Sequence, residues 1–169
     1  MSGVVVDASA ALKLLREEQG SADVRLHLRE RVLAREPILV PALFWLEIIN
    51  VLATRYRYPP DAVVEAVYEL EQAGLATADV GRPGVLGVID AVGRTGLTAY
   101  DAAYLVLAES ADAMLLTADL HLASSAGDRA ILVGADGGVA ERPASFAVRP
   151  SWTAWKGAVA YLGELRSAL

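Results

Sequence analysis

The sequence predicts an α/β domain in which helices cover both faces of a mostly parallel sheet. Short apolar runs alternate with amphipathic segments, and the connections between them are short. The 169 residues are 54% hydrophobic and 21% charged, with a mean hydropathy of +0.37. This composition can fill a sizeable core and argues against disorder. We therefore expect one three-layer α/β/α domain.

Four short apolar runs predict the strands of this sheet. The first, residues 3–6, is rich in valine and ends at Asp7, as is typical of a strand buried on both faces of a parallel sheet. Residues 38–40, 113–117 and 131–133 have the same apolar character and predict the remaining strands. A carboxylate therefore follows the first strand directly.

Helices are predicted between these strands from apolar spacing and from proline positions. Pro41 suits the first turn of a helix, because proline has no amide hydrogen to leave unpaired there. Pro59 and Pro60 separate that helix from the next one, in which apolar residues recur at helical spacing. The expected helices are residues 9–17, 21–35, 42–56, 60–73, 83–94 and 98–109.

Several kinds of catalytic site are excluded by the residues that are missing. The chain has no cysteine, which rules out disulfides, thiolate zinc sites and cysteine nucleophiles. Its two histidines, His27 and His121, are far apart, and neither lies in an H-E-x-x-H pattern. There is no G-x-S-x-G elbow, and neither Lys13 nor Lys156 follows a glycine as in a P-loop. Carboxylates are the abundant reactive groups that remain.

We expect a cytoplasmic protein with no membrane partner. The longest uncharged stretch, residues 37–46, contains two prolines and is far shorter than the roughly 18 apolar residues of a membrane span. The N-terminus shows no basic segment followed by an apolar stretch and a cleavage signal.

Because the net charge is −6 and the pI is near 4.9, a nucleic acid would have to be held by local arginines and by metal.

Four carboxylates stand out by their positions. Asp7 and Asp119 follow predicted strands, and ligands of open parallel sheets bind at the carboxyl ends of strands. Glu47 is the only charged residue within residues 43–52, where burial without a partner would be costly. Asp101 lies at the start of a predicted helix. One shared metal site would explain all four carboxylates.

Each carboxylate also has a purely structural explanation. Helix capping explains three of them, and pairing with an arginine explains Glu47, although a buried ion pair must overcome desolvation. The candidate caps are Asp7, in competition with Ser9, for the first helix, Thr98 with Asp101 as a capping box, and Asp119 for residues 120–125.

Four segments carry these residues in a characteristic order. They are the Val-Val-Asp-Ala-Ser run of residues 5–9, the apolar helix with Glu47 and Asn50, the Thr-Ala-Tyr-Asp-Ala-Ala-Tyr run of residues 98–104, and the Leu-Leu-Thr-Ala-Asp run of residues 115–119. Together they resemble the PIN domain, specifically the VapC-type ribonuclease toxins of bacterial toxin–antitoxin pairs. The resemblance extends from about residue 3 to residue 133 and implies a PIN-like fold.

The resemblance implies an endoribonuclease that cleaves RNA with Mg²⁺ or Mn²⁺ as cofactor. It also implies a small antitoxin protein as partner and a homodimeric state. Oxygen ligands without cysteine or histidine suit these hard ions. The implied metal-binding and catalytic acids are Asp7, Glu47, Asp101 and Asp119, with Ser9, Thr117 and Asn50 supporting them.

Different roles are expected for these residues. Asp7 and Asp101 are expected to bind the ion directly, and Asp119 to bind a second or weakly occupied ion. Glu47 is expected to bind the ion or to orient the attacking water. Ser9 is expected to cap the first helix and to hold Asp7 in place, a role that affects metal affinity.

The last part of the chain departs from the family pattern. We expect a nuclease domain over residues 1–135 and a C-terminal extension over residues 136–169, longer than is usual for such toxins. In the extension, Ser151 can cap a helix in which Trp152 and Trp155 share an apolar face. We expect this face to pack on the domain rather than on a partner, because large apolar faces most often close a core.

Two other functions fit parts of the sequence. A catalytically silent module can use the same fold to bind a protein or RNA partner. A haloacid-dehalogenase-like phosphatase also has an aspartate after its first strand, but it needs a second aspartate where this chain has Ser9. Metal-dependent RNA cleavage that is lost in Asp7→Asn and Asp101→Asn would distinguish the nuclease from both.

Overall fold

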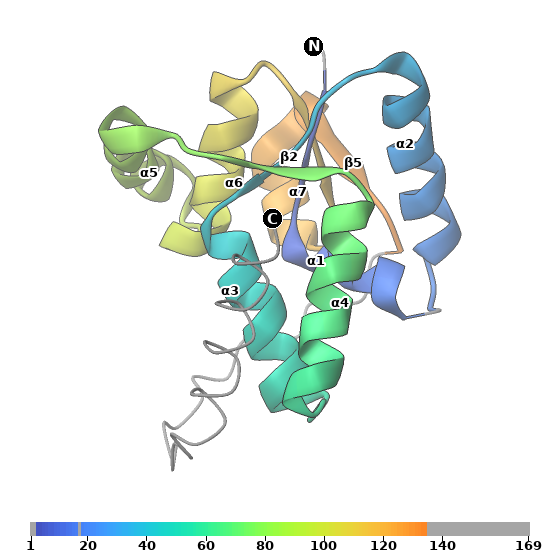
Figure 1. Ribbon diagram of the computed structural model, residues 1–169. Helices are drawn as coiled ribbons and strands as arrows, with labels where there is room; N and C mark the ends of the chain where they lie inside the picture. Colours follow the sequence, from blue (N-terminus) through green and yellow to red (C-terminus); the bar gives the residue numbers. More distant parts are fainter. Residues whose placement is uncertain (1–2, 17, 135–169) are drawn as a thin grey trace, which may run out of the picture. The chain divides into compact units, whose positions relative to one another are not determined.

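Five short strands form one parallel sheet in the computed structural model, which describes residues 3–16 and 18–134 (Figure 1). The strands are β1 (Val4–Val6), β2 (Ile38–Pro41), β3 (Leu75–Ala78), β4 (Met114–Thr117) and β5 (Ala130–Leu132). Their spatial order is β3-β2-β1-β4-β5, and every neighbouring pair is parallel. The predicted C-terminal extension, with its helix after Ser151, lies outside the described residues.

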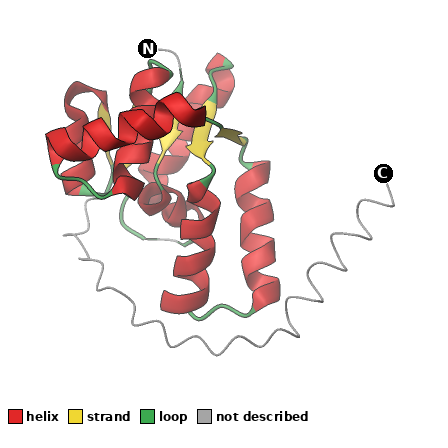
Figure 2. Ribbon diagram, turned by 90° about the vertical axis from the view of Figure 1, so that its left-hand side faces the viewer, coloured by secondary structure: helices red, strands yellow, loops and turns green. Residues whose placement is uncertain are grey.

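Helices cover both faces of this sheet, which confirms the predicted three-layer α/β/α fold. They are α1 (Ala8–Leu15), α2 (Ser21–Ala34), α3 (Leu43–Asn50), the π-helix η1 (Val51–Arg55), α4 (Pro60–Gln72), α5 (Gly81–Thr95), α6 (Ala99–Ser110), α7 (Leu120–Ala126) and the 3₁₀ helix η2 (Gly127–Arg129). In Figure 1, α5 and α6 lie on one side of the sheet and α2 on the other. Together, α3 and η1 contact α4, and these helices extend away from the sheet as two neighbouring arms (Figures 1 and 2). Within the described ranges, no helix has both the length and the apolar character needed to cross a membrane.

The innermost strand, β1, lies between β2 and β4, and its residues Val4, Val5 and Val6 are fully buried. After β1 the chain builds β2 and β3 on one side, and it then returns to place β4 on the other side. The boundary between β1 and β4 is therefore a topological switch point, where the carboxyl ends of strands leave a crevice for ligands. The backbone N–H of Asp7 donates to the carbonyl oxygen of Leu116 at 3.0 Å, so the ends of these two strands are neighbours, as expected.

Helix α6 packs against the strands on both sides of this switch point. Residues 102–108 are all buried, and α6 contacts β1, β2 and β4 as well as α5 and α7. Thr98 caps the helix by accepting a hydrogen bond from the backbone N–H of Asp101 at 3.2 Å, which confirms the N-cap half of the expected capping box. The first turn of α6 is therefore fixed against the sheet by its cap and by the buried turns that follow.

Three local features differ from the expectations. No strand was expected at β3, because its sequence, Leu-Ala-Thr-Ala, contains two alanines and alanine is depleted in strands. Pro41 was expected in a helix but is the last residue of β2, in register with Ala78. The helix expected over residues 42–56 divides into α3 and η1, where the N–H of Tyr56 donates to the carbonyl of Val51. Such i→i+5 bonds are rare, and local sequence does not signal them.

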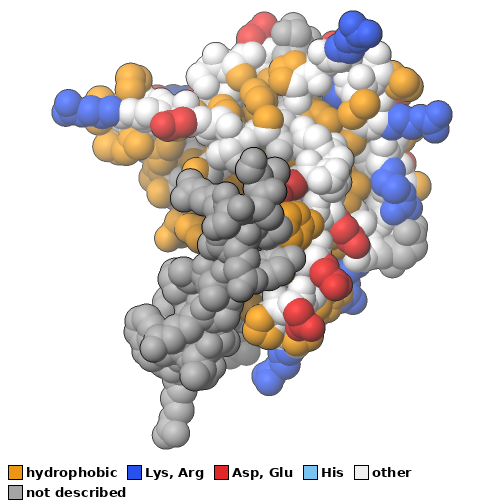
Figure 3. All heavy atoms as spheres, in the orientation of Figure 1, with side chains coloured by type: hydrophobic (Ala, Val, Ile, Leu, Met, Phe, Trp, Pro, Cys, Tyr) orange, Lys and Arg blue, Asp and Glu red, His pale blue; other side chains and the backbone are white. Residues whose placement is uncertain are grey.

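Charged side chains are unevenly distributed on the face seen in Figure 3. Acidic side chains gather where Figure 1 places α4, and Lys and Arg side chains lie farther to the right, where it places α2. The sequence of α2 includes Arg25, Arg29 and Arg31, and α4 carries four acidic residues between 60 and 72. An anionic ligand that approaches this face is therefore repelled by α4, which carries no basic residue.

Gly20 and Gly74 offer a matched test of close backbone packing. Both have a left-handed φ, +87° and +86°, but a Cβ on Gly20 would lie 2.8 Å from the Cα of Gly134, whereas a Cβ on Gly74 would meet no atom within 4 Å. We expect Gly20→Ala to lower the free energy of unfolding by at least about 1 kcal/mol more than Gly74→Ala, because only Gly20→Ala adds a clash to the strain. Urea denaturation of both variants measures this difference, and equal losses would contradict it.

Candidate active site

The candidate active site centres on Asp7. This residue follows β1, is the N-cap of α1 and has 6% of its surface exposed. Its Oδ2 accepts hydrogen bonds from the backbone N–H of Ser9 at 3.3 Å, from the hydroxyl of Ser9, and from the hydroxyl of Thr117 at 2.8 Å. The expectation that Ser9 caps the first helix is wrong, because α1 begins at Ala8 and Ser9 lies inside its first turn.

The two hydroxyls also join this carboxylate to the end of β4. The Oγ of Ser9 accepts a hydrogen bond from the N–H of Ala118 at 2.9 Å, and the Oγ1 of Thr117 accepts one from the N–H of Asp119 at 3.0 Å. Each hydroxyl therefore accepts a hydrogen bond from a backbone N–H and donates one to the Asp7 carboxylate. The structure thus places Ser9 and Thr117 in direct contact with the acid that they were expected to support.

Burial raises the pKa of Asp7 from 3.8 to about 6. Hydrogen bonds from Ser9 and Thr117 lower this pKa, and the negative charge of Asp101 raises it. The hydrogen-bond donors are neutral groups, so a bound cation would stabilise the ionised carboxylate much more strongly than they do. A buried acid in this setting is a candidate for metal binding.

Asp101 contributes to the same site from the first turn of α6. It is half-buried, and its Oδ2 accepts a hydrogen bond from the hydroxyl of Thr98 at 2.7 Å. Because its charge raises the pKa of Asp7, the two carboxylates are electrostatic neighbours. Capping and site formation are therefore compatible: Thr98 restrains the Asp101 side chain, which acts on Asp7 through its charge.

Glu47 is connected to the site by a residue that was not among the expected site residues. The fully buried phenol of Tyr104 donates a hydrogen bond to Oε2 of the half-buried Glu47. Burial, and then the negative charges of Glu47 and Asp7, raise the pKa of the Tyr104 phenol, so it stays protonated. Tyr104 lies three residues after Asp101, and that spacing places both on one helix face, which was the signal available in the sequence.

Asp119 and Asn50 lie at the margins of this arrangement. Asp119 is half-buried and caps α7, since its Oδ1 accepts a hydrogen bond from the N–H of Leu122 at 2.7 Å. Asn50 is exposed at the end of α3, and its backbone carbonyl oxygen accepts a hydrogen bond from the hydroxyl of Thr54. In the part of the chain that the structure describes, no hydrogen bond joins the Asn50 side chain to Asp7, so the supporting role expected of Asn50 stays a prediction.

The chemistry of these donors fits a hard divalent cation. The side chains that contact Asp7, those of Ser9 and Thr117, present oxygen, and Mg²⁺ typically uses one or two carboxylates and keeps several waters. Across residues 3–16 and 18–134, no group of three or more Asp, Glu, His or Cys side chains forms a metal site. Each of the four carboxylates is held by its own hydrogen-bond donor. The assignment of four metal-binding acids therefore stays a prediction.

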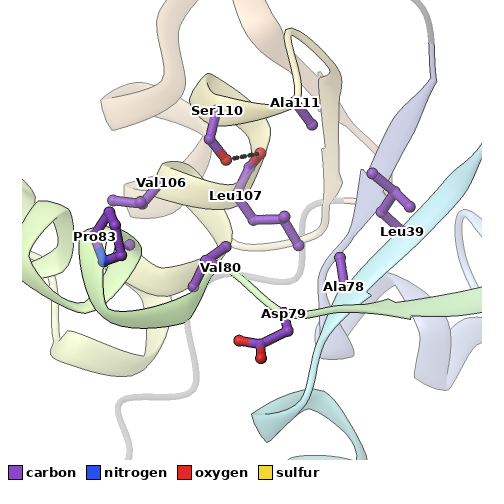
Figure 4. A pocket seen from close by; sticks show the side chains of 10 residues that line it. Leu39, Ala78, Asp79, Val80, Pro83, Val106, Leu107, Ser110 and Ala111 are labelled. Carbon is purple, nitrogen blue, oxygen red and sulfur yellow. Dashed lines mark hydrogen bonds between the residues drawn. The ribbon is translucent and has the colours of Figure 1, made fainter.

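A cavity of about 470 Å³ lies apart from these residues (Figure 4). It is lined by parts of β2, β3, α5 and α6, and most of its lining is apolar. Its polar groups include Asp79, which accepts a hydrogen bond from the N–H of Gly81 at 2.7 Å, and Ser110, which donates one to the carbonyl of Leu107. None of the expected site residues lines this cavity, so it is not the candidate active site.

The fold and the site define a class: parallel α/β domains with a buried aspartate at the carboxyl edge of the central strand. The model of one family, described as PIN domain, matches residues 4–127. This chain belongs to the PIN domain family. A comparison with curated proteins gave no match.

Solved structures share this fold. PAE2754 from Pyrobaculum aerophilum has 24% sequence identity and a TM-score of 0.56, and the match covers 77% of this chain and 88% of that one. A toxin–antitoxin complex from Klebsiella pneumoniae has 15% identity and a TM-score of 0.56, over 76% and 95% of the two chains. VapC20 of Mycobacterium tuberculosis, described as a sarcin–ricin loop cleaving toxin, has 16% identity and a TM-score of 0.52, over 72% and 94%.

Proposed function

We propose that this protein is a divalent-metal-dependent endoribonuclease that acts as the toxin of a toxin–antitoxin pair. The observation that carries the proposal is the buried Asp7, which lies at the switch point of a PIN-domain sheet with oxygen donors and the charge of Asp101 around it. Buried acids that need a cation to stabilise their charge are typical of metal-dependent phosphodiester cleavage.

The structural neighbours support the biological part of the proposal. One is a toxin–antitoxin complex and another is described as a toxin that cleaves the sarcin–ricin loop. By analogy with them we expect an RNA substrate and a small antitoxin protein as partner. The family resemblance implies a homodimer, and the cytoplasmic location stays a prediction from the sequence.

Each site residue has its own role in the proposed reaction. Asp7 and Asp101 would hold Mg²⁺ or Mn²⁺, and the hydroxyls of Ser9 and Thr117 keep the Asp7 carboxylate in one orientation. Glu47 would accept a proton from the attacking water or help to hold the ion. When bound, the ion would lower the pKa of water and stabilise charge on the phosphate oxygens.

A second requirement for metal comes from the charge of the whole molecule. The net charge of −6 opposes the approach of RNA, which carries one negative charge per phosphate. Two carboxylates at the reaction centre would add to this repulsion. A divalent cation held by these carboxylates would reduce the repulsion at the reaction centre, so cleavage should depend on metal concentration.

Cleavage of defined RNA oligonucleotides at increasing Mg²⁺ or Mn²⁺ concentration tests the proposal. We expect cleavage to rise with metal, to stop when a chelator is added, and to fall by at least about 100-fold in Asp101→Asn, because a divalent ion supplies several kcal/mol of transition-state stabilisation. Circular dichroism should show that Asp101→Asn remains folded. If Asp101→Asn, purified in parallel, cleaves as fast as the parent, the catalytic assignment is wrong.

One observation favours a second candidate function. Because no group of three acids forms a metal site within the described ranges, the same fold could serve as a catalytically silent module that binds RNA or a protein. A silent module would bind RNA without any metal-dependent product, and its affinity would not depend on Asp101. The oligonucleotide assay measures cleavage, and a binding titration of the same RNA with the parent and Asp101→Asn measures affinity. Together they separate the two functions.

A further inference from the structure

We propose that Tyr104 is a positioning residue that holds the Glu47 carboxylate next to Asp7 through its phenol hydroxyl. This inference rests on the proposed nuclease function and deepens it. The hydroxyl is the group that matters, since an aromatic ring alone would fill the same space in the core. Tyr104 is therefore assigned a role that its burial does not require.

The phenol is held in a fixed position. Tyr104 has no exposed surface and is among the largest fully buried side chains of the described chain. It belongs to α6, whose residues 102–108 are all buried and which contacts three strands of the sheet. A side chain packed in this way has one rotamer available, so its hydroxyl cannot follow a moving partner. The Glu47 carboxylate must therefore adopt the position that the fixed hydroxyl sets.

This hydroxyl joins two elements and lies close to Asp7. Tyr104 extends from α6 and Glu47 belongs to α3. Because an ionised carboxylate can only accept hydrogen bonds, the phenol is the donor to Glu47. The negative charges of Glu47 and Asp7 both act on the phenol, so the hydroxyl lies near both acids.

This hydrogen bond restrains Glu47. The residue is half-buried on α3, in an arm that extends from the sheet, and ordering a glutamate side chain costs rotamer entropy. A hydrogen bond from a rigid phenol offsets part of this cost before substrate binds. The carboxylate is then already oriented for proton transfer or metal contact, and less ordering remains for the reaction itself.

Tyr104→Phe removes the hydroxyl and keeps the ring. We expect kcat for RNA cleavage to fall about 10- to 100-fold with KM unchanged, which is the usual loss when a supporting hydrogen bond to a metal-site residue is removed. The matched control is Tyr68→Phe on α4, a half-exposed tyrosine with no role in the site, for which both constants should stay unchanged. A thermal unfolding curve for each variant shows that the domain is folded.

A double-mutant cycle separates positioning from simple packing. In the Glu47→Ala background, Tyr104→Phe should change kcat by less than about twofold, because the carboxylate on which the phenol acts is absent. If the phenol only packs the core, its removal would cost as much in that background as in the parent. The inference is overturned if Tyr104→Phe lowers kcat as much in the Glu47→Ala background as in the parent, or if it does not lower kcat in the parent.

Metal binding without RNA gives an independent readout. Calorimetric titration of the RNA-free protein with Mn²⁺ should show about tenfold weaker binding in Tyr104→Phe and unchanged binding in Tyr68→Phe. If the parent neither binds Mn²⁺ nor cleaves RNA, the proposed function fails. If the parent does both and Tyr104→Phe does both equally well, the positioning role alone is wrong.

Discussion

Replacing Asp7 with asparagine is expected to reduce metal-dependent RNA cleavage by about 100- to 1000-fold while the protein stays folded. The substitution keeps the size of the side chain and a carbonyl oxygen that can accept hydrogen bonds from Ser9 and Thr117. It removes the negative charge that would hold the cation, and such an ion supplies several kcal/mol to phosphodiester cleavage. Initial rates on a defined RNA at saturating Mg²⁺ measure the loss.

Asp90→Asn is the matched control for this experiment. Asp90 lies on α5, is 71% exposed and pairs with Arg94, so its removal changes charge by the same amount at a surface site. An exposed pair of this kind contributes less than about 1 kcal/mol to stability. The control should cleave like the parent protein. Equal cleavage rates for Asp7→Asn and the parent would show that the Asp7 carboxylate is not needed for cleavage.

The second large effect is expected in the metal-free protein, whose stability should fall as the pH rises from about 4 to about 7. The pKa of Asp7 is about 6 in the folded protein and 3.8 without burial, so the folded state binds more protons between these values. Folding is therefore favoured at low pH and penalised once Asp7 ionises, by an amount of the order of 3 kcal/mol at neutral pH. Urea denaturation at several pH values measures this slope.

Comparison with Asp7→Asn isolates the contribution of this one group. Other titrating residues act equally in both proteins, so the difference in stability between parent and variant should grow with pH and level off above about pH 7. The variant should be the more stable of the two at neutral pH without metal. Saturating Mn²⁺ should stabilise the parent and leave the variant nearly unchanged. Parallel stability curves for the two proteins would show that Asp7 does not titrate in this range.

The edge of the sheet that carries the site was predictable because it follows from local sequence. A buried valine run that ends at Asp7, and another apolar run that ends at Thr117, both place polar groups at the carboxyl ends of strands. Parallel pairing then brings these ends together without further information. The contact between Asp7 and Thr117, 110 positions apart, is a direct result.

The contact between Tyr104 and Glu47 was not predictable in the same way. It depends on how α6 packs against the sheet and on where α3 leaves β2, and neither is set by local spacing. A tyrosine among alanines and leucines is typical of a core position, so its hydroxyl gave no separate signal. Likewise, β3 forms because β2 offers it a partner, although its own residues have little strand preference.

The placement of β1 has a consequence for how the protein loses its active form. Both neighbours of β1 must separate from it before Asp7 can leave its position, since β1 pairs with β2 on one side and with β4 on the other. Opening of that kind requires disruption of the whole sheet, whereas strands at the border can fray locally. We therefore expect the amides of β1, which ends next to Asp7, to be among the last to exchange with solvent, and the site around Asp7 to be lost only when the whole domain melts.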